Sequence, residues 1–175
     1  MGAIELAQVL ASYCEANGKA NLNLSIGDDL VDPLNLRFYI ALHFRRMVQP
    51  KLKAEEIATI ECGLYASPEH LNSVERPTCP NDFRLHQCLG YMFQPSVDNW
   101  IPSQWAFPEG AEKQVVDVKK LRACFNSGVA LRQFALAGLG LAVLPKMCVR
   151  AELGSGQFKE VLPDWASLSP RLFAN

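Results

Sequence analysis

The sequence predicts an α/β protein, because stretches with the period of a β-strand alternate with stretches typical of a helix. Residues 20–26 alternate strictly between polar and apolar side chains, as in a strand with one buried face. Residues 38–42 form a continuous apolar run, as expected for a strand that is covered on both faces. Because parallel neighbours need a crossover connection such as a helix, this order predicts mixed, mostly parallel sheets.

Two helices are predicted in the first third of the chain. Apolar side chains cover one broad face of a helix over residues 4–14, and the Asn-Gly pair at 17–18 is typical of a helix C-terminus. A second, short helix is predicted over residues 30–36, with Asp28 or Asp29 as its N-cap.

The middle of the chain repeats the strand–helix–strand order. Residues 57–65 are typical of a strand, and Ser67 with Pro68 opens a helix that has proline at its first position. A loop is predicted at 77–82, and another strand at 86–93.

A hairpin and a further strand–helix–strand unit are predicted next. Residues 104–107 and 113–118 form the arms of the hairpin, and a Pro-Glu-Gly-Ala sequence supplies the turn between them. Residues 121–125 are typical of a strand, and an Asn-Ser pair caps a helix that runs to residue 137. A Gly-Leu-Gly turn then leads into an apolar strand at 141–144.

Composition and charge limit the possible functions. The 175 residues suffice for one domain or two small lobes, and 49% hydrophobic and 20% charged residues are ordinary values for a globular protein. A surface that neutralises many DNA phosphates needs a basic excess. Here 17 Lys and Arg stand against 18 Asp and Glu, which gives a net charge of −1. We therefore expect this chain alone not to bind DNA strongly.

Neither a metal centre nor a membrane segment is predicted. The six cysteines form no C-x-x-C pair and lack a histidine at ligand spacing, so we expect buried or half-buried thiols, no metal and no cofactor. They are Cys14, Cys62, Cys79, Cys88, Cys124 and Cys148. No apolar run approaches the roughly 20 residues of a membrane span, and the first residues lack the pattern of a secretory signal. We expect a cytoplasmic protein without membrane contact.

Four segments of the chain resemble the effector-binding domain of LysR-type transcriptional regulators, in the family's order. The most specific is LRACFNSGVALRQFALAGLGLAVLP at residues 121–145, where a strand, a capped helix, a Gly-Leu-Gly turn and a strand ending in Leu-Pro follow one another. Residues 64–71, in which Ala-Ser-Pro opens a helix, and the segments 88–91 and 156–165 also match. The resemblance covers residues 2–165.

This resemblance implies a two-lobed α/β fold like that of type II periplasmic binding proteins, with two crossovers and a ligand cleft between the lobes. Applied to this chain, the resemblance implies a first lobe at residues 1–58 plus 163–175 and a second lobe at residues 59–162. Hinges are expected near Ala58 and Leu162. In the family a winged helix-turn-helix and a linker helix precede this domain. Nothing here resembles either, so we expect contact with DNA only through a winged-helix domain absent from this chain.

The chain departs from the family pattern in the first lobe. It begins too late to supply the family's opening strand, and it stops at Asn175, before the family's last strand and helix. The aspartate that usually follows the phenylalanine of the third strand is Tyr39 here, and the glycine near the end of that strand falls at 44–46. We therefore expect an incomplete first lobe whose strand edges pair with another chain.

Ligands of open α/β sheets bind at the carboxyl ends of strands, where helix N-termini offer N–H donors. Three such strand ends can be recognised, and a fourth group of residues begins the first helix of the second lobe. The predicted ligand contacts are Gly27 and Asp28, Phe44 and Arg45, and Asn126 and Ser127 at the strand ends, with Ala66 and Ser67 at the helix start. Simpler explanations exist, since Asn126 and Ser127 also suit helix N-caps, and Arg45 with Arg46 also suits a solvated charge pair. Arginines at a strand end favour a small organic anion such as a carboxylate.

The sequence as a whole predicts a ligand-sensing regulatory domain with no catalytic residues. It contains no nucleophile elbow, phosphate-binding loop or zinc-protease motif, and its Gly-Leu-Gly turn lacks the third glycine of a dinucleotide site. Two alternatives stay open: a free-standing solute-binding protein, and a truncated regulator fragment that acts by hetero-dimerisation. We expect a small-molecule effector and a homodimer or higher oligomer, with the helices at 4–14 and 127–137 in the interface.

Overall fold

The computed structural model contains three sheets and describes residues 3–25, 40–43, 53–92, 104–109, 112–118, 121–165 and 170–174. The largest sheet has the spatial order β7 (Leu121–Phe125), β4 (Cys88–Tyr91), β8 (Leu141–Pro145), β3 (Cys62–Ala66) and β9 (Lys159–Val161). A second sheet has the order β1 (Leu42–His43), β10 (Arg171–Ala174) and β2 (Glu55–Thr59). A separate hairpin consists of β5 (Gln104–Glu109) and β6 (Glu112–Asp117).

Parallel and antiparallel pairs both occur in the five-stranded sheet. Strand β4 runs parallel to β7 and β8, whereas β3 is antiparallel to β8 and β9. The ladders of the second sheet and of the hairpin are antiparallel. Mixed sheets are thus confirmed, while parallel pairs are the minority among the described ladders. The reason is the path of the chain, which enters the large sheet through β3 in the direction opposite to the other four strands.

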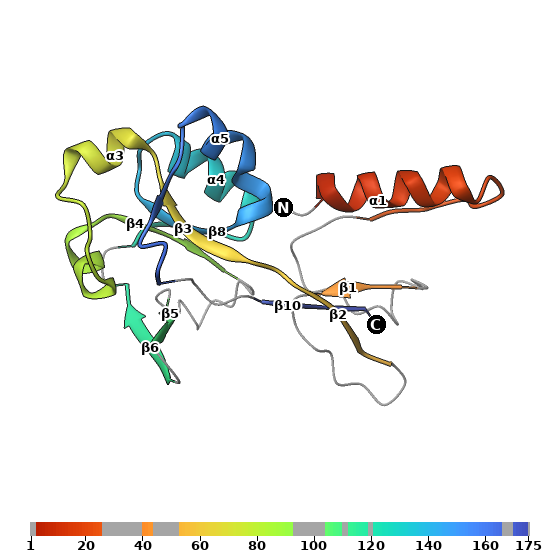
Figure 1. The fold of residues 1–175 in the computed structure, drawn as a ribbon, viewed down its shortest axis with the longest axis horizontal. Helices are drawn as coiled ribbons and strands as arrows, with labels where there is room; N and C mark the ends of the chain where they lie inside the picture. Colours follow the sequence, from red (N-terminus) through yellow and green to blue (C-terminus); the bar gives the residue numbers. More distant parts are fainter. Residues whose placement is uncertain are drawn as a thin grey trace.

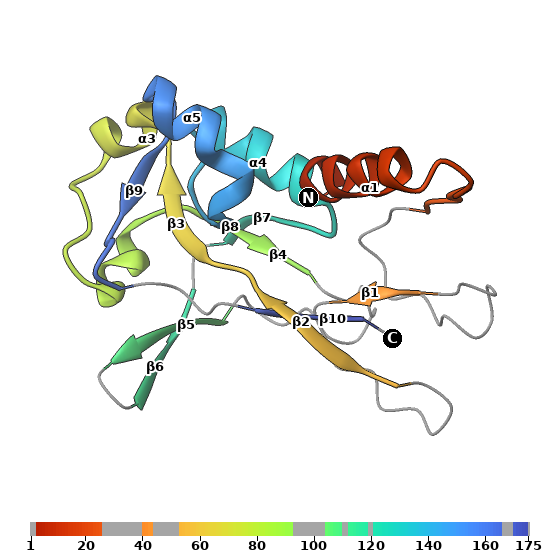
Figure 2. The same cartoon turned by 45° about the vertical axis from the view of Figure 1, so that its right-hand side comes forward.

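Two helices, α4 (Gly128–Leu136) and α5 (Arg150–Ser155), cover one face of the five-stranded sheet (Figure 2). Leu131 and Ala135 lie one turn apart on α4 and are both buried, as expected for a helix with one apolar face. The core beneath these helices consists of Tyr65, Leu89, Leu131, Ala135, Ala142, Leu144, Val149 and Phe158.

The opposite face is covered by the 3-10 helix η1 (Pro80–Leu85) and the β5–β6 hairpin. Trp105 of β5 meets Phe83 of η1 edge-on, with ring centroids 5.4 Å apart. This contact attaches the hairpin to the sheet, because aromatic pairs in this arrangement bury a large apolar area. The core on this face consists of Leu64, Ala66, Phe83, Cys88, Trp105, Val118, Leu141 and Val161.

Helix α1 (Ala3–Ala16) and the β1–β10–β2 sheet form a second region, separate from the five-stranded sheet (Figure 1). We call this region the first lobe and the region around the five-stranded sheet the second lobe. The chain crosses from β2 to β3 and returns from β9 to β10. The two crossings touch where the Ile60 amide donates to the Pro170 carbonyl, 2.8 Å away. Within the described residues, every buried side chain lies between Cys62 and Val161.

Most predicted elements are confirmed with small shifts in their bounds. The helix predicted at 4–14 is α1, and the strand predicted at 121–125 is β7. Helix α3 (Pro68–Ser73) has proline at its first turn as predicted. The strand predicted at 57–65 is interrupted and forms β2 and β3, and part of the loop predicted at 77–82 is helical in η1.

The prediction of a strand at residues 20–26 is wrong for the described residues 20–25. These residues are irregular, and no strand in the described part of the chain pairs with them. Two-residue alternation shows only that one face could be buried, whereas a strand also needs a neighbour for its N–H and C=O groups. Of the strand predicted at 38–42, only Leu42 lies in a strand, β1, which pairs with β10. Ile40 and Ala41 are irregular, and Ile40 is exposed, so the expectation of a strand covered on both faces is wrong for these residues. Residues 38 and 39 lie outside the described residues. The helix predicted at 30–36 lies outside the described residues.

Candidate ligand-binding site

The reversed direction of β3 gives the five-stranded sheet two different ends. Cys62 at the start of β3 pairs with Pro145 at the end of β8, while Tyr65 pairs with Ala142 near the start of β8. Because β3 follows β2 directly, the end that holds Cys62 and Pro145 faces the first lobe (Figure 2). The carboxyl ends of β4, β7 and β8 therefore face the first lobe, and the carboxyl end of β3 lies at the far end.

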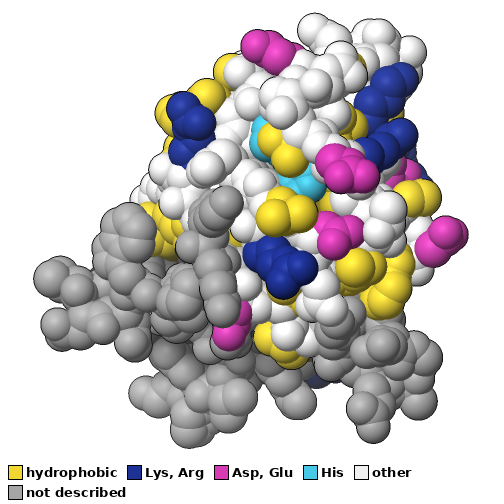
Figure 3. Space-filling model, turned by 90° about the vertical axis from the view of Figure 1, so that its left-hand side faces the viewer, with side chains coloured by type: hydrophobic (Ala, Val, Ile, Leu, Met, Phe, Trp, Pro, Cys, Tyr) yellow, Lys and Arg dark blue, Asp and Glu magenta, His cyan; other side chains and the backbone are white. Residues whose placement is uncertain are grey.

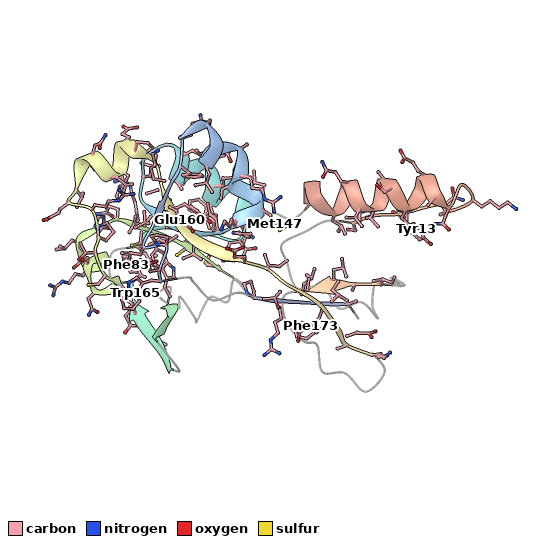
Figure 4. The ribbon with its side chains drawn as sticks, viewed as in Figure 1. Tyr13, Phe83, Met147, Glu160, Trp165 and Phe173 are labelled. Carbon is pink, nitrogen blue, oxygen red and sulfur yellow. The ribbon has the colours of Figure 1, made fainter. Side chains whose placement is uncertain are left out.

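Side chains labelled in Figure 4 show which residues lie toward the first lobe and which lie at the far end of the sheet. Met147, just after β8, lies on the side of the second lobe toward the first lobe. Glu160, whose backbone pairs with Tyr65, lies on the far side, as do Phe83 and Trp165. The direction of β3 thus decides which polar groups a molecule between the lobes would meet.

Asn126 and Ser127 lie at the end of the sheet that faces the first lobe. They follow β7, whose last carbonyl, that of Phe125, accepts from the Met92 amide at 2.7 Å. Ser127 is the N-cap of α4, and its hydroxyl accepts from the Ala130 amide at 3.5 Å. The first turn of a helix carries N–H groups without intrahelical partners and a partial positive charge. This end of the sheet therefore presents hydrogen-bond donors beside the exposed Asn126 side chain.

Ala66 and Ser67 lie at the opposite end, and the structure does not bring them near Asn126 and Ser127. Ala66 is fully buried in the core. Ser67 is buried and caps α3, its hydroxyl accepting from the His70 amide at 3.3 Å. The capping role that the sequence offered as the simpler explanation for Asn126 and Ser127 is confirmed for Ser127. The cause of the separation is that β3 ends where β4, β7 and β8 begin.

Four further predicted contacts lie outside the described residues. They are Gly27, Asp28, Phe44 and Arg45, and Arg46 lies outside as well. Their place at the cleft stays a prediction.

Sequence reasoning missed an ion pair at the end that faces the first lobe. Lys146, which follows β8, contacts the Glu61 carboxylate at 2.9 Å, and its backbone amide donates to the Glu61 carbonyl at 2.9 Å. The hydrogen bond and charge of Glu61 raise the pKa of Lys146 above its usual value. Since 85 residues separate the two positions, no local pattern could have indicated the pair. Both side chains are substantially exposed, so a ligand anion could compete with Glu61 for Lys146.

The cysteines have the environments that the sequence predicts. Cys62 and Cys88 are buried, and the other four are half-buried. Burial raises the pKa of both buried thiols to about 12, so they carry no thiolate near neutral pH. In the described part of the chain, no three His, Cys, Asp or Glu side chains lie close enough to hold a metal ion. No helix of that part is long and apolar enough to cross a membrane.

Two lobes joined by two crossings, with the carboxyl ends of β4, β7 and β8 and the N-terminus of α4 facing the first lobe, define a two-lobed α/β domain. Residues 1–174 match the family model of the LysR substrate binding domain, and the chain belongs to this family. An uncharacterized HTH-type transcriptional regulator of Haemophilus influenzae is 27% identical over 94% of this chain and 55% of its own length. CrgA, an HTH-type transcriptional regulator of Neisseria meningitidis, is 24% identical over 93% of this chain and 52% of its own length.

Solved structures of LysR-type regulators share the fold. Full-length AphB of Vibrio cholerae superposes with a TM-score of 0.78 at 21% identity, over 99% of this chain and 57% of that chain. The regulatory domain of CrgA superposes with a TM-score of 0.75 at 24% identity, over 97% of this chain and 80% of that chain. The two-lobed fold is thereby confirmed. The chain spans about half the length of the curated relatives that it matches.

Proposed function

We propose that this chain senses a small-molecule effector that binds between the two lobes, with Asn126 and Ser127 among its contacts. One observation carries the proposal: the carboxyl ends of β4 and β7 and the N-terminus of α4 all face the first lobe. These are the positions at which α/β folds present unpaired N–H donors to ligands. The domain would act as the regulatory part of a transcription regulator, working in the cytoplasm and without catalysis of its own.

The proposed effector is a small organic anion such as a carboxylate. The positive end of the α4 dipole and the Lys146 ammonium lie at the same end of the sheet and favour a negative charge there. Arg45 and Arg46 are proposed to approach from the first lobe. DNA contact is assigned to a winged-helix domain outside this chain, in keeping with the chain's net charge of −1.

The lobe boundaries are proposed at residues 58/59 and 162/163. Leu162 supports the second boundary, because its φ of 52° lies in the left-handed region that a branched side chain rarely adopts. A residue held in such a conformation at a crossing is a natural point for the chain to bend. The hydrogen bond between Ile60 and Pro170 joins the two crossings beside it.

Ser127→Ala and Ser67→Ala form a matched pair of variants that tests the site. Both remove an N-cap and should cost about 1 kcal/mol of stability each. Only Ser127 faces the first lobe, so in a thermal-shift screen of small carboxylates Ser127→Ala should lose the ligand-induced shift of the wild type, and Ser67→Ala should keep it. Arg45→Ala plus Arg46→Ala tests the proposed contribution of the first lobe. Equal ligand shifts in all four proteins would contradict the assignment.

We also propose that the chain assembles through apolar side chains on α1 and α4. Val9 and Tyr13 of α1 expose 67% and 52% of their surface, and Val129 and Phe134 of α4 expose 58% and 41%. Val9 and Tyr13 lie one turn apart on α1, while Val129 and Phe134 are five positions apart on α4. Exposed apolar groups of this kind favour burial against another helix. A homodimer in which α1 of one protomer packs on α4 of its partner would cover both faces.

A further inference from the structure

An ion pair ties one of the two crossings between the lobes to the second lobe. Only Ile60 and Glu61 separate the end of β2 at Thr59 from the start of β3 at Cys62. The Glu61 carboxylate accepts a hydrogen bond from the Lys146 ammonium at 2.9 Å, and the Glu61 carbonyl accepts one from the Lys146 backbone amide, also at 2.9 Å. The side chain and the backbone of Glu61 therefore bind the same residue of the second lobe.

Lys146 lies at the end of the five-stranded sheet that faces the first lobe. It begins the 3-10 helix η2 (Lys146–Val149) directly after Pro145, the last residue of β8, and Pro145 pairs with Cys62. On the far end of the second lobe, basic and acidic side chains lie interspersed over the described part of the face seen in Figure 3. A negative group between the lobes would therefore meet the Lys146 ammonium.

Among the described residues, Glu61 is the acidic side chain in contact with Lys146. Glu160 and Arg150 also act on the Lys146 ammonium, but through their charge alone, whereas Glu61 adds a hydrogen bond. Glu160 favours the positive charge and Arg150 opposes it. A carboxylate of the chain itself therefore already occupies the contact that Lys146 could offer to an anion.

The side-chain contact between Lys146 and Glu61 can be exchanged without disturbing the fold. The two side chains expose 43% and 68% of their surface, so a dissolved carboxylate can reach the Lys146 ammonium directly. Such an exposed pair contributes little to stability, because both partners keep much of their hydration. The backbone hydrogen bond between the two residues does not involve the carboxylate, and it keeps β3 beside β8 when the Glu61 side chain leaves.

Lys146 and the N-terminus of α4 are separate contacts at the same end of the sheet. Ser127 follows β7 and Lys146 follows β8, and β4 lies between these two strands. Neighbouring strands are about 4.8 Å apart, so the ends of β7 and β8 lie about 10 Å from each other. A carboxylate at Lys146 therefore leaves the N-terminus of α4 to another part of the same effector.

We propose that Glu61 is an internal competitor for the effector. In the ligand-free chain its carboxylate occupies the Lys146 ammonium, and the carboxylate of an effector displaces it. This competition rests on the proposed function, in which the effector is a small organic anion. Glu61 raises the threshold for binding, because only an anion that holds Lys146 better than the chain's own glutamate gains from this contact. Displacement also frees the Glu61 side chain on the crossing, so that ligand binding acts directly on the connection between the lobes.

Glu61→Gln keeps the length of the side chain and removes the competing charge. Titration calorimetry with benzoate, succinate and citrate at constant ionic strength measures the affinity of the whole chain for carboxylates. We expect Glu61→Gln to bind the best of the three about two- to fivefold more tightly than the wild type, the range of an exposed ion pair. In the Lys146→Gln background the same substitution should change nothing, because no ammonium is left to compete for. Glu56→Gln is the matched control, since it removes the same charge from the exposed pair with Arg171 and should leave the affinity unchanged.

Carbon NMR of the Glu61 carboxyl group follows the displacement itself. A saturating carboxylate should move the wild-type signal to the position that it has in ligand-free Lys146→Gln. A signal that does not move, or an equal gain of affinity in the Lys146→Gln background or in Glu56→Gln, would overturn the competition. The effector site would then still stand if Ser127→Ala loses carboxylate binding. If none of the three carboxylates binds the wild type, the competition and the proposed carboxylate effector both fail.

Discussion

Arg132 of α4 and Glu152 of α5 form an ion pair that joins the two helices on one face of the five-stranded sheet. Their side chains expose 24% and 9% of their surface, so the pair is shielded from water more than the other ion pairs of the described residues. Removing one partner of such a pair leaves the other charge without compensation in a poorly solvated place.

We expect Arg132→Met to lower the free energy of unfolding by about 3 kcal/mol, the usual result of breaking a buried pair. Arg171→Met is the matched control, because Arg171 pairs with Glu56 at 3.1 Å on an exposed part of β10. That substitution should change stability by about 0.5 kcal/mol or less. Urea unfolding measures both, and equal effects would show that burial of the first pair has no energetic consequence.

Gly63→Ala and Gly154→Ala should have effects of opposite sign. A Cβ at Gly63 would lie 2.4 Å from Oη and 2.7 Å from Cζ of Tyr65, whose ring is fully buried. Forcing that ring aside should cost about 1–3 kcal/mol. A Cβ at Gly154 meets no atom within 4 Å and lies in helix α5, so alanine there should stabilise the protein by up to about 1 kcal/mol. Thermal unfolding of the two variants checks the signs.

Stability should fall as the pH drops below 6.5. Burial lowers the pKa values of His70 and His86 from the usual 6.5, so the unfolded chain binds protons that the folded chain does not. The contribution is fully present above 6.5 and is lost as the pH falls from 6.5 toward the lowered folded-state values. Two such groups give a maximum slope of about 2.7 kcal/mol per pH unit. Urea titrations between pH 5 and 7.5 measure the slope, and His70→Gln plus His86→Asn should flatten it.

A lysine on either exposed helix face should weaken self-association. We expect Val9→Lys on α1 and Val129→Lys on α4 each to shift the protein toward a monomer of 19.4 kDa, because each places a charge in the proposed apolar interface. Val115→Lys on β6, at a valine that is 55% exposed, is the control and should leave the assembly unchanged. Equilibrium sedimentation at low micromolar concentration decides, and a wild type that is already monomeric would contradict the interface.

Local chemistry explains why much of the second lobe could be predicted. The strand at 121–125, the cap at Ser127 and the proline at the start of α3 depend on neighbours within about four residues, and the sequence shows those neighbours directly. The strand predicted at 20–26 failed for the opposite reason. Its alternation is local, but its existence required a hydrogen-bonding partner that no described strand supplies.

Ser67 and Ser127 show most clearly what the local sequence could not predict about the candidate site. Each follows a strand, caps a helix and accepts a hydrogen bond from the third residue on, so their local sequences predict the same role. Only the antiparallel pairing of β3 with β8 sends the two serines to opposite ends of the sheet. Pairing direction follows from the path of the whole chain, which no short pattern contains.

The sequence by itself determined the α/β class, the LysR resemblance, the two capped helices and the lack of a basic excess, because each rests on residue types and short spacings. Tertiary structure alone decided which strand ends face the first lobe, and it brought His70 to His86 and Arg132 to Glu152 across 16 and 20 positions. Contacts of this kind arise when separate elements bury their apolar faces together. For His70 and His86, that burial also lowers the pKa of each imidazole.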